Sequence, residues 1–104
     1  MKIAVPLLKD RVSPHFGASS TVLLVETNGT TICREATWEL PGGSPLDMAR
    51  RLADLGVEEI VCGGIQHRYK EWLIRKRIKV VDNQRGVARE IVQDLLRTQG
   101  QKRK

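Results

Sequence analysis

The chain has 104 residues, of which 40% are hydrophobic and 29% charged, and this balance fits one globular domain and excludes a long disordered chain. The formal net charge of +6 favours anionic partners such as nucleic acid, phosphates or an anionic cofactor. Two cysteines are too few for a disulfide scaffold, and free thiols fit a reducing compartment. We find no secretory signal and no apolar run long enough for a membrane helix, so we expect a cytoplasmic protein.

The first segment predicts a strand at residues 1–5 followed by a long loop. Ile3, Ala4 and Val5 form a continuous apolar run, which is typical of a central strand buried on both faces. Pro6 ends this run, and residues 6–19 carry two prolines and a glycine. Loops of this length are often functional.

An antiparallel pair of strands is predicted next. Residues 21–26 are β-branched and apolar, Thr27-Asn28-Gly29 is a hairpin turn signal, and residues 30–39 alternate. We expect this alternation to place Ile32, Arg34, Ala36 and Trp38 on one face, and Thr31, Cys33, Glu35 and Thr37 on the other. The second of these strands would be an exposed edge, open to pairing with another chain.

The second half of the chain alternates helix and strand. After a loop at residues 40–43, Ser44 predicts an N-cap with Pro45 at the first helical position, and the helix ends at Leu55 before Gly56. A strand at residues 57–62 leads into Gly63-Gly64. A helix at about residues 66–76 follows, with Tyr69, Trp72 and Leu73 facing the core, then a strand at 78–81, a helix at 86–98 and a disordered basic tail at 99–104. This order predicts an α/β domain with parallel strands joined by right-handed crossovers.

Three segments resemble the dinitrogenase iron–molybdenum cofactor-binding family. They are Met-Lys-Ile-Ala-Val-Pro at residues 1–6, Val-Ser-Pro-His-Phe-Gly at residues 12–17 and Val-Cys-Gly-Gly-Ile at residues 61–65. The resemblance implies one domain over residues 1–98 with a ribonuclease-H-like fold. That fold has three helices and a five-stranded mixed sheet in the order 3-2-1-4-5, with strand 2 antiparallel. Two departures are the absence of a histidine in residues 41–45, and Gln66-His67 where relatives often have a glycine.

The resemblance implies a carrier or accessory protein for an iron–sulfur or iron–molybdenum cluster. Ligands of open α/β sheets bind outside the carboxyl ends of the strands, so the loops after the first and fourth strands would converge. An imidazole and a thiolate are ligands for iron, and glycines allow close backbone approach. The predicted cofactor-binding residues are Ser13, His15, Phe16, Cys62, Gly63 and Gly64, with His15, Cys62 and His67 as metal ligands.

This set is too incomplete for a structural zinc site, and it suits transient carriage. The expected partner is a protein that donates or receives a cluster. We expect no enzymatic activity, because no nucleophile–base pair or phosphate-binding loop is evident, and the first strand lacks the carboxylates of a two-metal nuclease. Two alternatives stay open: a regulatory or interaction domain that has lost the cluster, and a weak nucleic-acid binder. The sequence does not determine the oligomeric state.

Overall fold

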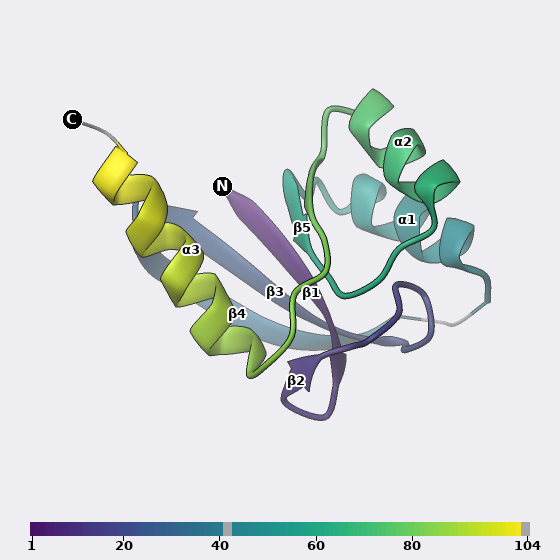
Figure 1. Ribbon diagram of the computed structural model, residues 1–104, viewed down its shortest axis with the longest axis horizontal. Coiled ribbons are helices and arrows are strands. Elements are labelled where there is room, and N and C mark those ends of the chain that lie inside the picture. The colour runs from purple at the N-terminus through teal and green to yellow at the C-terminus, as the bar shows by residue number, and fades with distance from the viewer. Residues whose placement is uncertain (41–42, 103–104) are drawn as a thin grey trace.

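A computed structural model describes residues 1–40 and 43–102, with side chains up to Thr98. Within these residues it contains three helices and a six-stranded mixed sheet, which confirms the α/β class (Figure 1). The elements are β1 (Lys2–Leu8), β2 (Arg11–Val12), β3 (Thr21–Asn28), β4 (Thr31–Glu39), α1 (Pro45–Asp54), β5 (Glu59–Val61), α2 (His67–Arg75), β6 (Lys79–Val81) and α3 (Ala88–Lys102).

The main path of the sheet is β4-β3-β1-β5-β6, and β2 pairs with β1 off this path. Strand β3 runs antiparallel to both β1 and β4, while β1, β5 and β6 are parallel. The predicted five-stranded order lacked β2 and is corrected by this extra strand. The ribonuclease-H-like classification stays a prediction.

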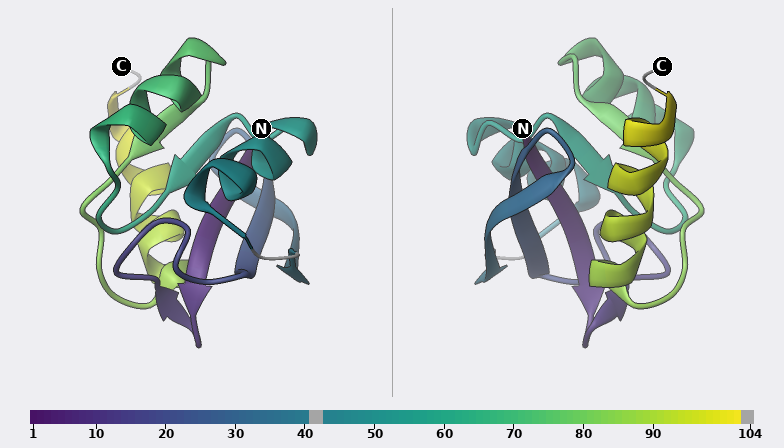
Figure 2. Two further views of the ribbon diagram at one scale, coloured as in Figure 1. Left: turned by 90° about the vertical axis from the view of Figure 1, so that its right-hand side faces the viewer. Right: turned by 90° about the vertical axis from the view of Figure 1, so that its left-hand side faces the viewer.

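Helices cover both faces of the sheet. Helices α1 and α2 lie on one face and α3 lies on the other (Figures 1 and 2). Each face has its own buried cluster. Ala4, Ile60 and Leu52 belong to the cluster between the sheet and helices α1 and α2. Val5, Val61 and Val92 belong to the cluster between the sheet and α3. Both faces of the central strands are therefore apolar, as the continuous run in β1 predicts.

The predicted end of the first strand at Val5 is too early. Strand β1 continues through Pro6 to Leu8 and turns back into β2, so part of the predicted loop at residues 6–19 is a short hairpin. A proline cannot donate a ladder hydrogen bond. Its carbonyl accepts a hydrogen bond from the amide of Ser13 at 2.9 Å, so the backbone groups of Pro6 point away from β3. The proline therefore removes no hydrogen bond between β1 and β3, and the strand can continue through it.

A β-bulge corrects the predicted alternation of residues 30–39. Glu26 pairs with Arg34 but Thr27 pairs with Ile32, which leaves Cys33 as an extra residue in β4. The bulge reverses the alternation at this point, so Ile32 packs on the α3 cluster and does not share a face with Arg34. Trp38, in the same strand, is 47% exposed.

The helix termini follow the sequence signals with small shifts. Ser44 caps α1 in a reciprocal capping box with Asp47, as expected. Helix α3 begins at Ala88 and continues to Lys102, so the predicted helix end at Thr98 is too early. The rest of the predicted tail, residues 103–104, and residues 41–42 of the predicted loop lie outside the described residues. Among the described helices, none is long and apolar enough to span a lipid bilayer.

Candidate functional site

A crevice of about 860 Å³ opens at the carboxyl ends of the parallel strands. Three loops form it: the loop after β1, the turn after β5 and the loop after β6. Its lining includes Arg11, Pro14, His15, Gly64, Asn83 and Arg85. The volume is within the range of ligand pockets. The position is the one expected for a ligand site in an open α/β sheet.

Backbone hydrogen bonds join the first two loops directly. Gly64 donates its amide to the carbonyl of Pro14 at 2.7 Å, and Phe16 donates to the carbonyl of Gly64 at 2.8 Å. Between these bonds, His15 and Gly64 form a parallel β-bridge. The predicted convergence of the two loops is therefore confirmed, and the backbone of His15 is fixed against the turn after β5.

The third loop is held to the same turn. Asn83 donates to the carbonyl of Gly63 at 2.9 Å, and Gln84 donates to the carbonyl of Cys62 at 3.0 Å. Asn83 adopts a left-handed backbone with φ of 60°, a conformation that asparagine tolerates better than most residues. The chain can therefore turn sharply after β6 and follow the edge of the crevice.

Strand β2 connects the crevice to the start of α3. Val12 donates its amide to the carbonyl of Gly86 at 2.9 Å, and Ala88 donates to the carbonyl of Asp10 at 3.0 Å. Arg11 therefore lies beside the loop that carries Arg85. All sides of the crevice are linked by backbone bonds, so its shape is largely preformed.

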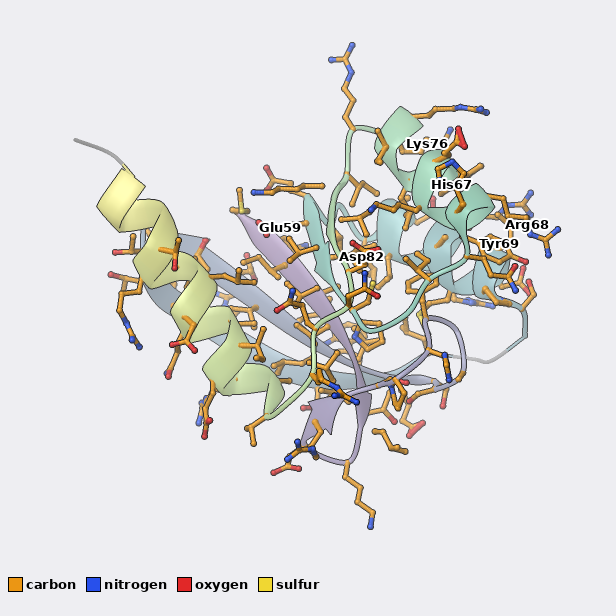
Figure 3. All side chains as sticks on the ribbon, viewed as in Figure 1. Glu59, His67, Arg68, Tyr69, Lys76 and Asp82 are labelled. Carbon is orange, nitrogen blue, oxygen red and sulfur yellow. The ribbon has the colours of Figure 1, made fainter. Side chains whose placement is uncertain are left out.

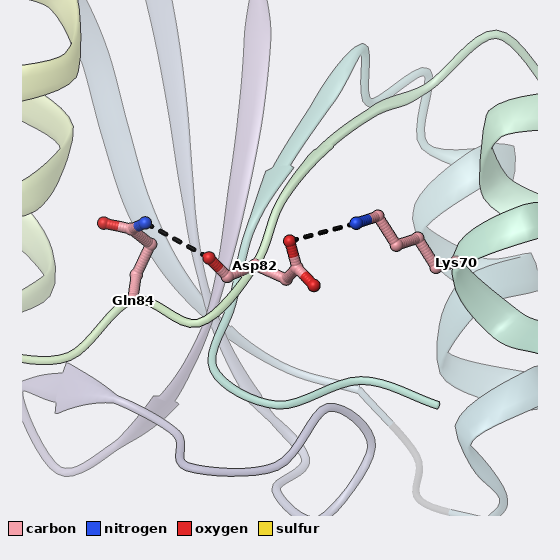
Figure 4. Close-up of polar contacts among 3 residues, drawn as sticks. All are labelled: Lys70, Asp82 and Gln84. Carbon is pink, nitrogen blue, oxygen red and sulfur yellow. Dashed lines mark hydrogen bonds and ion pairs between the residues drawn. The ribbon is translucent and has the colours of Figure 1, made fainter. Parts of the chain in front are cut away.

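An ion pair connects helix α2 to the loop after β6. The Nζ of Lys70 lies 3.1 Å from Oδ1 of Asp82, and both side chains are partly buried (Figure 4). The side chain of Gln84 donates to the backbone carbonyl of Asp82 at 3.1 Å. These contacts fix the first residues of the third loop.

Basic side chains dominate the charge of the crevice. Arg11 in β2 and Arg85 in the loop after β6 both line it, together with the exposed His15. Arginine is suited to binding carboxylate or other oxyanion groups through paired hydrogen bonds. Neither arginine was predicted from the sequence. A signal was available, because Arg85 lies in the turn after the last parallel strand, beside the turn at Gly63-Gly64.

Cys62 does not face the crevice. Its side chain has no exposed surface and belongs to the apolar cluster beneath α1 and α2. Burial, with the nearby Asp82 carboxylate, raises the pKa of the thiol to about 12 in spite of the opposing charge of Lys70. Only a thiolate binds metal well. In this structure Cys62 is a core residue outside the crevice lining, and its burial argues against the predicted role as a metal ligand.

His67 is also not part of the crevice. It lies in the first turn of α2 with a side chain 83% exposed, and its Nε2 is 2.5 Å from Oε1 of Glu71 one turn along the helix (Figure 3). The structure does not bring His67 into the crevice lining with His15, because the first turn of α2 directs its side chain to the outer surface.

The other predicted site residues are two buried side chains that support the loops and two glycines at the crevice. Phe16 is buried in the α1–α2 cluster, and Ser13 is buried with its hydroxyl bonded to the carbonyl of His15 at 3.2 Å. Gly63 and Gly64 line the crevice. Gly63 is needed because the backbone carbonyls of Ser13 and Pro14 occupy the space that a β-carbon would require.

The donor set suits an anion better than a bare metal ion. Across the described residues, no three His, Cys, Asp or Glu side chains gather closely enough to hold a metal ion. His15 is the one imidazole of the crevice lining, and the arginines supply positive charge. The crevice therefore suits an anionic ligand in charge.

Comparison with known proteins gives a consistent assignment. The family described as dinitrogenase iron–molybdenum cofactor matches residues 1–98. The crystal structure of PH0822 superimposes with a TM-score of 0.88 at 25% identity, over 94% of this chain and 90% of that one. No curated protein matches the chain.

Two further structures share the fold at lower identity. A candidate dinitrogenase from Methanocaldococcus jannaschii has a TM-score of 0.75 at 15% identity, over 95% of this chain and 90% of that one. A candidate NifB protein from Thermotoga has a TM-score of 0.73 at 18% identity, over 94% and 89%. At these identities the likeness concerns the fold alone.

Proposed function

The chain belongs to the dinitrogenase iron–molybdenum cofactor family, and from this premise we propose that it binds an iron–sulfur or iron–molybdenum cluster as cargo in the crevice beside His15. The observation that carries the proposal is the composition of the lining. Arg11 and Arg85 line the crevice from separate segments of the chain, together with the exposed His15. Metalloclusters with sulfide bridges are commonly anionic, so the arginines would bind their charge while His15 ligates one metal.

The weak ligand set suits transient carriage. Iron–sulfur clusters held permanently are usually ligated by several cysteine thiolates. Here Cys62 is sealed in the core and Cys33 is on the edge strand β4, away from the crevice. A cluster held by one imidazole and by charge can be released readily. We therefore propose a binding role, not catalysis, with a protein that donates or receives the cluster as partner.

The test is anaerobic incubation of the purified protein with ferrous iron and sulfide, followed by desalting, absorption spectroscopy, and iron and sulfide analysis. We expect charge-transfer absorption that is lost in His15→Ala and kept in Cys62→Ala. His67→Ala is the matched control, because it removes an exposed histidine outside the crevice. The absence of absorption in the unmodified protein, or equal losses in both histidine variants, would reject the proposal.

The same experiment addresses the alternative roles. An interaction domain without cargo would retain no iron and would still bind its protein partner. A weak nucleic-acid binder would shift labelled nucleic acid at low salt only, because such binding depends on counterion release.

A further inference from the structure

Strand β4 forms a free edge of the sheet, independent of the crevice and its cargo. It is the outermost strand of the main path (Figure 2). The residues that line the crevice come from other segments. All residues of β4 from Cys33 to Glu39 are exposed. Such an edge is a template for pairing with another strand.

The direction of its backbone groups is set by the pairing with β3. Leu40, the residue after β4, donates its amide to the carbonyl of Ser20, the residue before β3. In an antiparallel ladder the backbone groups alternate between the two sides. The groups of Arg34, Ala36 and Trp38 therefore point to β3, and those of Glu35 and Thr37 point outward.

We propose that a second copy of this chain pairs antiparallel with β4 across a two-fold axis, with Ala36 opposite Ala36. This register places Glu35 opposite Thr37 of the other copy, so the outward backbone groups of both residues form hydrogen-bonded pairs. Ala36 is then the non-hydrogen-bonded pair on the axis, where side chains approach most closely. Its small methyl group fits this central position.

Charge selects this register among the neighbouring ones. Moving the two-fold axis from Ala36 to position 35 places Glu35 opposite Glu35, and moving it to position 34 places Arg34 opposite Arg34. Moving the axis to position 37 places Glu35 opposite Glu39. Like charges directly opposite one another destabilise a sheet. The proposed register avoids each of these contacts.

A side-chain contact between the two copies would favour the same arrangement. Arg34 lies opposite Trp38 of the other copy, and the 47% exposed indole offers a surface for the guanidinium.

The bulge at Cys33 limits the pairing to residues 34–38, since it bends the strand beyond them. A short edge interface is small, so we expect dimerisation that depends strongly on protein concentration.

A cysteine scan tests the register. In a Cys33→Ser background, Glu35→Cys, Ala36→Cys and Thr37→Cys are oxidised separately, and covalent dimers are measured on non-reducing gels. We expect Ala36→Cys alone to cross-link efficiently, because Cα atoms at a non-hydrogen-bonded pair lie about 4.5 Å apart while pairs beyond about 7 Å cannot form a disulfide. Preferential cross-linking at position 35 or 37, or equal weak cross-linking at all three, would overturn the proposal.

A second measurement avoids engineered thiols. Thr37→Pro removes an outward amide without removing a bond to β3, whereas Thr37→Ala keeps that amide. Sedimentation equilibrium over a range of concentrations should show association for the unmodified chain and Thr37→Ala, and only monomer for Thr37→Pro with unchanged circular dichroism. Monomer for the unmodified chain at every concentration would contradict the proposal.

Discussion

Gly63 lies so close to Pro14 that a β-carbon at position 63 would be 2.5 Å from the Pro14 carbonyl oxygen. This contact joins the turn after β5 to the loop that carries His15. Backbone atoms surround the position, so an added methyl group cannot be accommodated by a side-chain rotation. The glycine is therefore a requirement of the loop–loop contact, whatever ligand the crevice holds.

Gly63→Ala should destabilise the protein by roughly 1–3 kcal/mol, the usual cost of forcing a methyl group into a packed site. It should also displace His15 from the crevice. The measurement is urea unfolding, combined with iron loading of the folded variant.

Gly64→Ala is the matched control, because a β-carbon there would lie 3.4 Å from the Pro14 carbonyl oxygen, at ordinary contact distance. We expect a much smaller loss of stability. Equal effects of the two substitutions would show that the Gly63–Pro14 contact does not limit the structure.

The arginines of the crevice predict a salt-dependent loading. Arg85→Gln and Arg11→Gln should each lower the iron retained after desalting at low salt, and the difference from the unmodified protein should shrink at high salt, because screening weakens the attraction that each arginine supplies. Arg50→Gln is the control, since Arg50 is exposed on α1 outside the crevice. Iron retention that responds equally to all three variants would mean that the cargo is held by general charge.

Much of the fold could be predicted from local signals. The hairpin signal at Asn28-Gly29, the cap at Ser44 and the alternating helices and strands of the second half all gave elements that the structure contains. The bulge at Cys33 could not be predicted, because it depends on the register of β3 against β4 and not on a residue preference. Pro6 misled for a related reason, since its tolerance depends on which side of β1 its backbone groups face.

The site was predicted in position and only partly in composition. The sequence located both converging loops, but it could not show which face of the sheet the side chain of Cys62 occupies. A thiol and a small apolar side chain are interchangeable in a strand pattern. In the structure, the side chains of Ile60 and Cys62 both face α1 and α2, as alternation along the strand requires. Arg11 and Arg85 were missed because an isolated arginine in a loop looks like ordinary surface.

The Lys70–Asp82 ion pair should stabilise the third loop of the crevice. Lys70→Met leaves the partly buried Asp82 without its cation, and we expect a loss of about 1 kcal/mol, near the upper end for partly exposed pairs. A double-mutant cycle with Asp82→Asn, followed by urea unfolding, isolates the pair from other effects of each change. A coupling energy near zero would show that the pair does not hold the loop.

The buried thiol of Cys62 predicts a distinct dependence of stability on pH. The pKa of this thiol is raised from 9.0 to about 12, with burial as the main cause. The unfolded chain therefore loses this proton first as the pH rises. The stability that the protonated thiol contributes is complete below pH 9.0 and is lost progressively between there and about 12. Within this window the free energy of unfolding should fall by about 1.4 kcal/mol per pH unit on account of Cys62 alone.

The comparison of Cys33→Ser with Cys33→Ser/Cys62→Ala isolates this effect, because lysine and tyrosine titrations are common to both proteins. Urea unfolding between about pH 8 and pH 10.5 should give a steeper loss of stability for the variant that keeps Cys62. In the unmodified protein at neutral pH, a maleimide should label Cys33 rapidly and Cys62 only after unfolding, since Cys33 is exposed and Cys62 is buried. Parallel pH profiles together with rapid labelling of both thiols would mean that Cys62 is accessible in solution, and the thiolate would then return as a candidate ligand for the cluster.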